Sequence, residues 1–470
     1  MTTRTTSRSR SRLAPTPRTI GLWLAAVVLV LTAGCRSVQQ ARAIQSPASM
    51  QPGERSLRRE ELMLAAGTRL TLEAAAVQAV SNSPSVFQAR MLLTLAATRW
   101  QQARANYLPQ IQLSSGYTID KPYNPTQPSL GAYRGGITLG QELLSFGRQE
   151  AELRQAQAEH AATAAQLQAA INTAAYAAHA VYFDLLAAED ALLITEEKVR
   201  AFAVHLEQVR VMAELGTRIR YDITKAEVDL GTSRLECLQA SNTLHLTRAA
   251  LGRVLGLTEE LPSLRLMWPA APAVPTEAMP TLFQYARLRH PELIALQALV
   301  EAASAAVDWA VADLRPDLSL RASTSGAGHA FPLGWNWSLG PSIAWDAFTG
   351  WRKTSALQGA TASLQACRSR LTSREQQLFQ DLISARIQWQ TALAQTMVAE
   401  SVVQAARESL ELVNARYALG LATAVELTDA EVAVAQARTQ QVLARRNGLT
   451  AWALLCLHTG GSAQREGASL

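Results

Sequence analysis

One sixteen-residue segment occurs twice in this chain of 470 residues, and the duplication constrains the fold more than any other feature. Residues 215–230 read LGTRIRYDITKAEVDL, and residues 419–434, which lie 204 positions later, read LGLATAVELTDAEVAV. Both begin with Leu-Gly, both place an acid six residues after the glycine (Asp222 and Glu426), and both contain Ala-Glu-Val. A segment that recurs at a long interval indicates a repeated structural unit. The sequence therefore predicts two copies of one unit.

Further matches set the limits of the repeats. Asn82-Ser83-Pro84 is matched by Arg289-His290-Pro291 at an offset of 207, and Phe146-Gly147-Arg148 resembles the segment 348–352 at an offset of 204. We expect repeat one over 71–256 and repeat two over 281–459, followed by a C-terminal tail over 460–470. The segment 257–280 is rich in proline, so no helix can cross it intact, and it is predicted to be a linker.

Each repeat contains a very long helical pattern. Apolar or small residues recur every 3.5 positions on average over 167–213 and again over 371–417, where only Glu375 interrupts them, and this spacing indicates coiled-coil packing within predicted helices over 148–214 and 350–418. A helix over 148–214 would extend about 100 Å. Shorter helices are predicted at 71–106, 219–256, 281–313 and 423–458, so that two of them stacked end to end match one long helix. Gly216 and Gly420 stand where each long helix must turn back, as capping glycines do.

Before each long helix the period changes to two. The segments 110–143 and 317–346 alternate apolar and polar residues around a loop, which predicts two β-hairpins with one apolar face. Strands of this kind suit a transmembrane barrel, and tryptophans near their ends suit its interfacial belt. The alternative is that both hairpins pack on a soluble core. In lipid, four strands leave intolerable open edges, and about eight are the minimum for a barrel. Copies of the chain would therefore have to pool strands, and three copies would supply twelve.

The N-terminus has the features of a signal peptide over 1–34. Five arginines precede the apolar segment Ile20–Leu31, which is too short to span a bilayer, and small residues follow before Cys35. The sequence LTAGC resembles a bacterial lipobox, which predicts that Cys35 carries a covalent lipid and that 35–70 form a lipidated arm. The alternative is a free cysteine near a processing site.

Composition excludes several classes of function. The formal net charge falls from +6 to +1 when the five signal-peptide arginines are removed, and no basic stripe remains, so we expect no nucleic-acid partner. The seven histidines lack zinc-type spacing, which predicts no metal site and no cofactor besides the lipid. The glycine-rich segment 325–329 lies between predicted strands and lacks the setting of a phosphate loop, so an enzyme is not expected. Cys237, Cys367 and Cys456 are predicted to be buried small hydrophobes.

A duplicated unit of helix, hairpin, very long helix, glycine-containing tip and returning helix resembles the outer membrane efflux protein family, the TolC/OprM-like outer membrane factors. The resemblance covers 71–459, its most specific motifs are Val211–Asp222 and Ala415–Asp429, and the lipobox favours the lipoprotein branch. It implies a mainly α protein with a β-barrel part. A homotrimer would form a 12-stranded barrel in the outer membrane of a Gram-negative bacterium, continued by a coiled-coil tunnel in the periplasm. The tips would dock a periplasmic adaptor that is joined to an inner-membrane pump.

The resemblance also implies roles for residues at the tips. Its adaptor-docking positions fall on Gly216, Thr217, Gly420 and Leu421. Its gate and selectivity positions fall on Asp222, Tyr417, Glu426 and Asp429. Relatives have a gate arginine where this chain has Ala422, and Arg218 is a candidate replacement.

Physical reasoning supports part of this assignment. Glu426 and Asp429 are three residues apart, so they share a helix face, and three copies would form an acidic ring that favours cations. A capping box that starts at Thr423 is the alternative explanation of Glu426.

The function predicted from the sequence is a passive outer-membrane exit duct of a tripartite efflux system for small toxic solutes or drugs. One alternative is the outer-membrane duct of a type I protein secretion system. The other is a coiled-coil lipoprotein that forms no channel.

Overall fold

The computed structural model describes residues 69–120, 130–216, 219–257, 264–270, 278–330 and 332–461. The predicted signal peptide, Cys35, nearly all of the predicted arm and most of the linker and C-terminal tail lie outside these ranges, as do Thr217 and Arg218. All the described ranges belong to one compact unit, Gly67–Leu470.

The duplication is visible in the order of the elements. Repeat one contains α2 (Leu72–Asn82), α3 (Pro84–Ala105), β1 (Gln110–Asp120), β2 (Leu130–Leu144), α4 (Arg148–Glu214) and α5 (Arg220–Leu255). Repeat two contains α6 (Met279–Arg289), α7 (Pro291–Ala312), β3 (Asp317–Gly328), β4 (Gly334–Ala344), α8 (Arg352–Ala418) and α9 (Ala424–His458). The two series correspond element for element.

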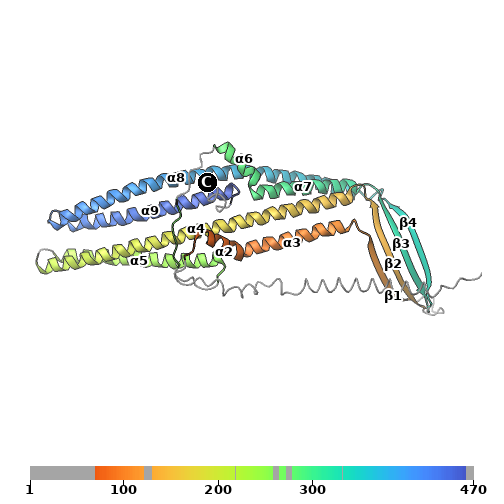
Figure 1. Ribbon diagram of the computed structural model, residues 1–470, viewed down its shortest axis with the longest axis horizontal. Coiled ribbons are helices and arrows are strands. Elements are labelled where there is room, and N and C mark those ends of the chain that lie inside the picture. The colour runs from red at the N-terminus through yellow and green to blue at the C-terminus, as the bar shows by residue number, and fades with distance from the viewer. Residues whose placement is uncertain are drawn as a thin grey trace, which may run out of the picture. The chain divides into compact units, whose positions relative to one another are not determined.

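The two long helices begin and end at equivalent positions. Both α4 and α8 contain 67 residues, which corresponds to about 100 Å each. Two residues with positive φ precede each helix, Phe146 (49°) with Gly147 (96°) before α4, and Gly350 (60°) with Trp351 (65°) before α8. The second long helix therefore begins at Arg352, two residues later than predicted. Helix α4 packs against α3 and α5, and α8 packs against α7 and α9 (Figure 1).

The prediction of single helices over 71–106 and 281–313 is wrong. The first is divided at Ser83, and the second is divided at His290. Each break directly precedes a proline, and the ψ angles of 123° and 117° are those of extended backbone. A proline ring disfavours helical backbone in the residue before it, so the chain bends there and starts a new helix.

The four strands form one antiparallel sheet in the order β1-β2-β3-β4. Strand β2 pairs with β3, so both repeats contribute to the same sheet, and β1 and β4 are its outer strands. The apolar face of the sheet is exposed, with Ile111 at 63%, Trp337 at 81% and Ile343 at 75% of full exposure. In a single chain this face has no protein layer over it, as a face that contacts lipid requires.

The core lies between the helices, where small side chains let the backbones approach closely. Alanines form much of the buried face of α4, and Tyr182 and Phe183 fill the space near its middle. In repeat two Leu378, Leu382 and Trp389 of α8 form a comparable cluster with residues of α6, α7 and α9.

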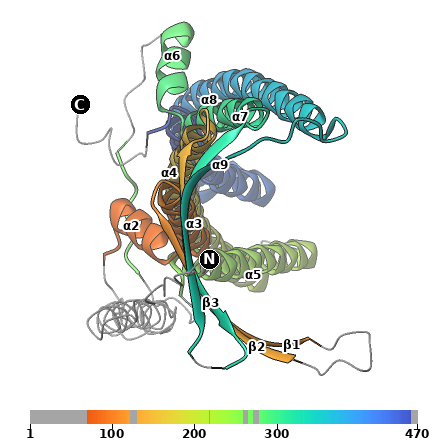
Figure 2. The ribbon, with the colours of Figure 1, turned by 90° about the vertical axis from the view of Figure 1, so that its right-hand side faces the viewer.

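Helix α7 contacts both α8 and α4, and it lies between them when seen from the strand end (Figure 2). Among the described helices it is the one that is long and apolar enough to cross a membrane by length and composition. Its packing between two helices accounts for the same composition. The cysteine prediction holds for Cys456, which is buried, and is wrong for Cys237 and Cys367, which are partly exposed.

Candidate functional site

Each pair of long and returning helices ends in a tight turn at a glycine. Gly216 and Gly420 have φ values of 75° and 73°, a backbone conformation that L side chains rarely adopt. At the second tip the Leu421 N–H donates to the Arg416 carbonyl (2.8 Å), and the Gly420 N–H donates to the Tyr417 carbonyl (3.0 Å). These two bonds form a Schellman motif, which satisfies the last carbonyls of α8. The glycines therefore fix where the exposed tip residues Leu419 and Leu421 lie.

Glu426 has two roles at the second tip. Its Oε1 accepts from the Thr423 backbone N–H (3.3 Å), while the Thr423 Oγ1 accepts from the Glu426 N–H (3.2 Å), so the capping box is present. Its other carboxylate oxygen lies 3.7 Å from the Arg416 guanidinium. The capping explanation is correct, and it does not exclude an electrostatic role for the same side chain.

Arg416 was missed by the sequence prediction. It lies in the last turn of α8, where it donates to the Leu421 carbonyl (3.1 Å) and pairs with Glu426. Ala422, the position at which the resemblance implied a gate arginine, is buried. A cation in the last turn of a helix suits the helix dipole, and this signal could have identified Arg416.

The remaining predicted gate residues occupy distinct environments. Asp222 lies in the first turn of α5, at the position equivalent to Glu426. Asp429 is exposed on α9, and its counterpart in repeat one is Lys225, so the two repeats carry opposite charges at this level. The Tyr417 ring lies 6.1 Å from the His205 ring and so connects α8 to α4. Within the described residues no ion pair joins Asp222 or Asp429 to another group.

A pocket of about 360 Å³ lies near the second tip, between α4, α8 and α9. Its lining includes Arg200, His205, Asn414 and Glu431. Burial raises the pKa of the Glu431 carboxyl. In repeat one the equivalent acid, Glu227, pairs with Arg210 at 2.8 Å. The residue equivalent to Arg210 is Asn414, so repeat two retains the acid but not the cation.

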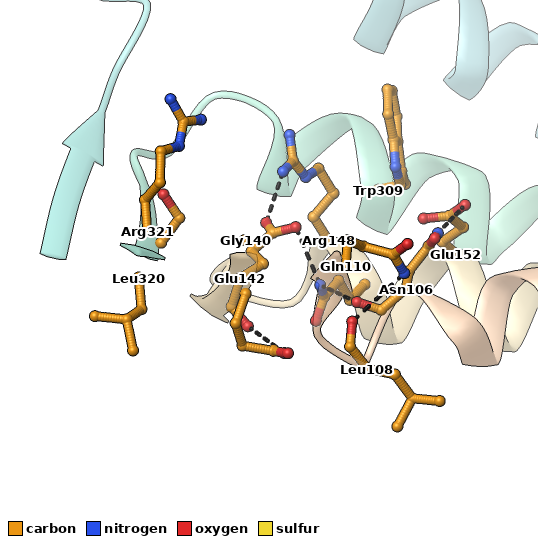
Figure 3. Close-up of a pocket in the computed structure, with 13 residues that line it drawn as sticks. Asn106, Leu108, Gln110, Gly140, Glu142, Arg148, Glu152, Trp309, Leu320 and Arg321 are labelled. Atoms are coloured by element: carbon orange, nitrogen blue, oxygen red, sulfur yellow. Dashed lines mark hydrogen bonds and ion pairs between the residues drawn. The ribbon is translucent and has the colours of Figure 1, made fainter. Parts of the chain in front are cut away.

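The junction between strands and helices is held by charges. The Arg148 guanidinium, at the start of α4, contacts Glu142 (2.6 Å) and Asp317 (3.0 Å), and lies 3.9 Å from Asp313. Figure 3 shows Arg148 and Glu142 joined beside an open pocket of about 420 Å³. Since Asp313 and Asp317 belong to repeat two, this cluster also joins the repeats.

Two buried histidines lie near the middle of the helical part. Burial lowers the pKa of His179 to about 4, and it lowers the pKa of His290 to about 4. His290 is the residue at which α6 gives way to α7, and the Arg374 guanidinium nearby bonds Glu292 (2.7 Å) and Asp381 (3.0 Å). These histidines are neutral where they are packed.

The profile of the outer membrane efflux proteins matches residues 75–257 and 282–461, which is most of the chain and both repeats. The chain belongs to the outer membrane efflux protein family. It is 23% identical over 369 residues to the outer membrane protein TolC of Vibrio cholerae, which covers 75% of this chain and 82% of that protein. It is 22% identical over 361 residues to SilC, a probable outer membrane lipoprotein of Salmonella typhimurium, which covers 75% of this chain and 78% of that protein.

The fold agrees with this assignment. The crystal structure of CusC superposes with a TM-score of 0.76 over 85% of this chain and 96% of that chain, at 19% identity. Members of the family are outer-membrane channels of Gram-negative bacteria, and the barrel-plus-tunnel fold predicted from the sequence is the fold of this chain. The protein is therefore an outer-membrane duct.

Proposed function

We propose that three copies of this chain form the outer-membrane duct of a tripartite efflux system, through which small toxic solutes or drugs leave the periplasm passively. The observation that carries this proposal is the four-stranded sheet with an exposed apolar face and two outer edges. Because unpaired strand edges are intolerable in lipid, the sheet requires neighbours, and three copies would supply twelve strands. A barrel of that size exceeds the eight strands that side chains alone can fill.

The proposed lumen is lined by the polar face of the sheet. Gln112, Ser114 and Thr118 alternate with Ile111, Leu113 and Ile119, which are exposed on the other face. This polar-inside alternation is what a water-filled barrel requires.

The proposed selectivity element is the set of acids at the tips. Asp222 and Glu426 occupy equivalent first turns of α5 and α9, so three copies would place six carboxylates at one level. Such a ring attracts cations and resists anions. At the next level Lys225 stands at the position equivalent to Asp429, so only repeat two contributes an acid there.

The proposed partners are a periplasmic adaptor and, through it, an inner-membrane pump. The tips present exposed apolar side chains at Leu215, Ile219, Leu419 and Leu421, which suit a docking surface. Thr217 and Arg218, which the resemblance also assigned roles at the tip, lie outside the described residues. The lipid on Cys35 stays a prediction, and mass spectrometry of the mature N-terminus tests it.

A secretion duct is the remaining alternative, whereas a lipoprotein that forms no channel is disfavoured because the family consists of channels. The test compares a deletion strain with a complemented strain. We expect the deletion to increase accumulation of dyes and toxic cations, with the set of secreted proteins unchanged. Loss of a protein from the medium without a change in accumulation would favour secretion. Single-channel conductance of the purified protein tests the duct itself, and absence of conductance would overturn both.

A further inference from the structure

The two repeats meet along a contact that we call the internal seam: β2 with β3, and α4 with α7 and α9. Because the chain is a duplication, its outer elements carry the two halves of an equivalent contact. Strand β4 and helix α8 correspond to β2 and α4, while β1, α3 and α5 correspond to β3, α7 and α9. We call the contact between these outer elements of neighbouring copies the subunit seam. This inference rests on the proposed trimer.

The surface of α8 indicates that a second copy covers it. Helices α4 and α8 have equal length, yet 20 side chains of α4 are buried and only 7 of α8. Phe183 is 0% exposed, whereas its counterpart Ile387 is 57% exposed. Ile194 is 5% exposed, whereas its counterpart Val398 is 61% exposed. Apolar side chains thus lie open in repeat two at positions that repeat one buries, so the occupant that fits is repeat one of another copy of the chain.

The internal seam supplies the register of the subunit seam. Gly140 lies opposite Arg321 in the β2–β3 pair. The position 204 residues after Gly140 is Ala344, and the position 207 residues before Arg321 is Ser114. The same offsets convert the pair Gln110–Gly140 of the first hairpin into the pair Asp317–Ala344 of the second, and that pair is observed. The offsets therefore hold within the sheet.

We propose that β4 of one copy pairs with β1 of the next in the register that places Ala344 opposite Ser114, and that this subunit seam lacks the ion pairs of the internal seam. The register also places Ile343 opposite Ser115 and Trp345 opposite Leu113. Ala344 and Ser114 belong to the polar faces of their strands, and Trp345 and Leu113 belong to the apolar faces. A slip of one residue would turn one strand's apolar side chains into the lumen, so it is excluded by the face pattern.

The charges distinguish the two seams. Within the described residues five ion pairs cross the internal seam: Arg148–Asp317 (3.0 Å), Arg148–Asp313 (3.9 Å), Arg154–Asp308 (2.9 Å), Arg446–Asp184 (2.6 Å) and Arg438–Glu197. At the equivalent positions of the subunit seam the chain has Arg352 with Gln110 and Asn106, Gln358 with Gln101, Asn242 with Gln388, and Arg234 with Ser401. No pair of opposite charges remains at any of the five.

The ion pairs of the internal seam distinguish contacts within one chain from contacts between chains. Arg148 and Arg154 of α4 pair with acids on repeat two of their own chain, whereas the equivalent positions of β1 and α3 are the amides Gln110 and Gln101. A contact that placed α4 of one copy against the outer face of α3 of another would lose these pairs. The charged internal seam therefore favours closure of each chain on itself, and the neutral subunit seam joins chains that have already closed.

Cysteine cross-linking tests the register in the full-length protein with Cys237, Cys367 and Cys456 replaced by serine. In S114C/A344C we expect oxidation to produce covalent dimers and trimers. In the control T118C/A344C the new thiol is displaced by about 13 Å along the strand, beyond the reach of a disulfide, so no ladder should form. In G140C/R321C the equivalent bond lies within one chain and should leave the oligomer ladder absent.

The outcomes separate the register from the function. The conductance of each reduced variant shows whether it has folded. A conducting oligomer that is linked in T118C/A344C and not in S114C/A344C would overturn the register and leave the duct intact. A folded S114C/A344C protein that stays monomeric and does not conduct would overturn the proposed trimer as well. A second pair, G116C/S342C, repeats the test at a neighbouring position of the same register.

Discussion

Arg416 and Glu426 face each other across the turn of the second tip, with the guanidinium Nη1 3.7 Å from the carboxylate Oε2. One residue ends α8 and the other begins α9, so their attraction holds the two helices of the pair together where they meet. Glu426 is partly fixed by its capping box, so replacing Arg416 removes the ion pair, together with the donor to the Leu421 carbonyl, and leaves the capping box in place.

We expect Arg416→Gln to increase the fraction of time that the duct is open. An exposed ion pair contributes about 0.2–1 kcal/mol. The equilibrium constant between the closed and the open duct should therefore shift toward the open duct by a factor of about 1.5 to 5. Single-channel recording measures this fraction. The control is Arg407→Gln, which removes an exposed cation from the same helix away from the turn. Equal open fractions in the two variants would show that Arg416 does not stabilise the closed tip.

Replacing the capping glycine with alanine should lower the stability of the protein, whereas replacing a glycine within a helix should raise it. Gly420 has a φ of 73°, so Gly420→Ala should destabilise the second tip by about 1–2 kcal/mol. Gly231 lies within α5 with open space around it, and its counterpart in repeat two is Ala435. Gly231→Ala should therefore stabilise the protein by about 0.5–1 kcal/mol. Thermal unfolding of the two variants checks the signs, and a stabilising Gly420→Ala would contradict the capping argument.

Much of this fold could be predicted because its signals are local. The stripe of α4 repeats over many turns, and the alternation of β1 and β2 needs only neighbouring residues to be recognised. The breaks at Ser83 and His290 were missed although Pro84 and Pro291 marked them, because the apolar pattern continues across each break. Proline tolerates the first turn of a helix, so it can signal either a start or an interruption.

The tip and the nearby pocket could be predicted only in part. The turn glycines and the capping box are sequence patterns, and the structure contains both. The contact of Arg416 with Glu426 depends on how the turn folds back, which the spacing of ten residues does not determine. The unmatched Glu431 becomes evident only when Asn414 is aligned with Arg210 and both are placed in space.

The helical part should lose stability in mild acid because of His290. Its folded-state pKa of about 4 lies below the usual value near 6.5. The unfolded state therefore binds more protons between these values, and stability that is complete above pH 6.5 is lost as the pH falls toward 4. Protonation of His290 should lower the free energy of unfolding by on the order of 3 kcal/mol at pH 4. The charged and titratable groups that face His290 are Glu292, Arg374, Asp381 and His458.

His290→Ser, which introduces the residue found at the equivalent Ser83, should reduce this acid slope. Urea unfolding at a series of pH values measures the slope. His245→Ser, an exposed change on α5, should leave it as in the original protein. An unchanged slope in His290→Ser would show that other groups are responsible.

Glu431 should change the stability with pH in the opposite direction to His290. Because burial raises its folded-state pKa, the folded state holds this proton more firmly, and the associated stability is lost as the pH rises through that pKa. Ionisation of the buried carboxyl lowers the stability, so Glu431→Gln should stabilise the protein more at high pH than at low pH. Glu227→Gln is the matched control, since Glu227 pairs with Arg210 and its removal should give no gain. Asn414→Arg should supply the missing cation and reduce the gain from Glu431→Gln.

An ion pair of the internal seam, introduced by substitution at the equivalent positions of the subunit seam, should stabilise the trimer. Gln101 and Gln358 stand where the internal seam has Asp308 and Arg154, which pair at 2.9 Å. Both glutamines are exposed in the single chain, so either can be replaced without disturbing a core. In the trimer Gln101→Asp of one copy would face Gln358→Arg of the next at three equivalent places. An exposed pair contributes about 0.2–1 kcal/mol, so the stability gained by the double variant should exceed the sum of the gains of the single variants by about 0.6–3 kcal/mol per trimer.

The measurement is the dissociation of the oligomer in detergent at increasing temperature, and the gain should shrink in high salt. Gln101→Arg with Gln358→Arg places like charges together and should lower the dissociation temperature. If both double variants dissociate alike, α3 and α8 of neighbouring copies do not face each other in this way, and the equivalence of the two seams fails.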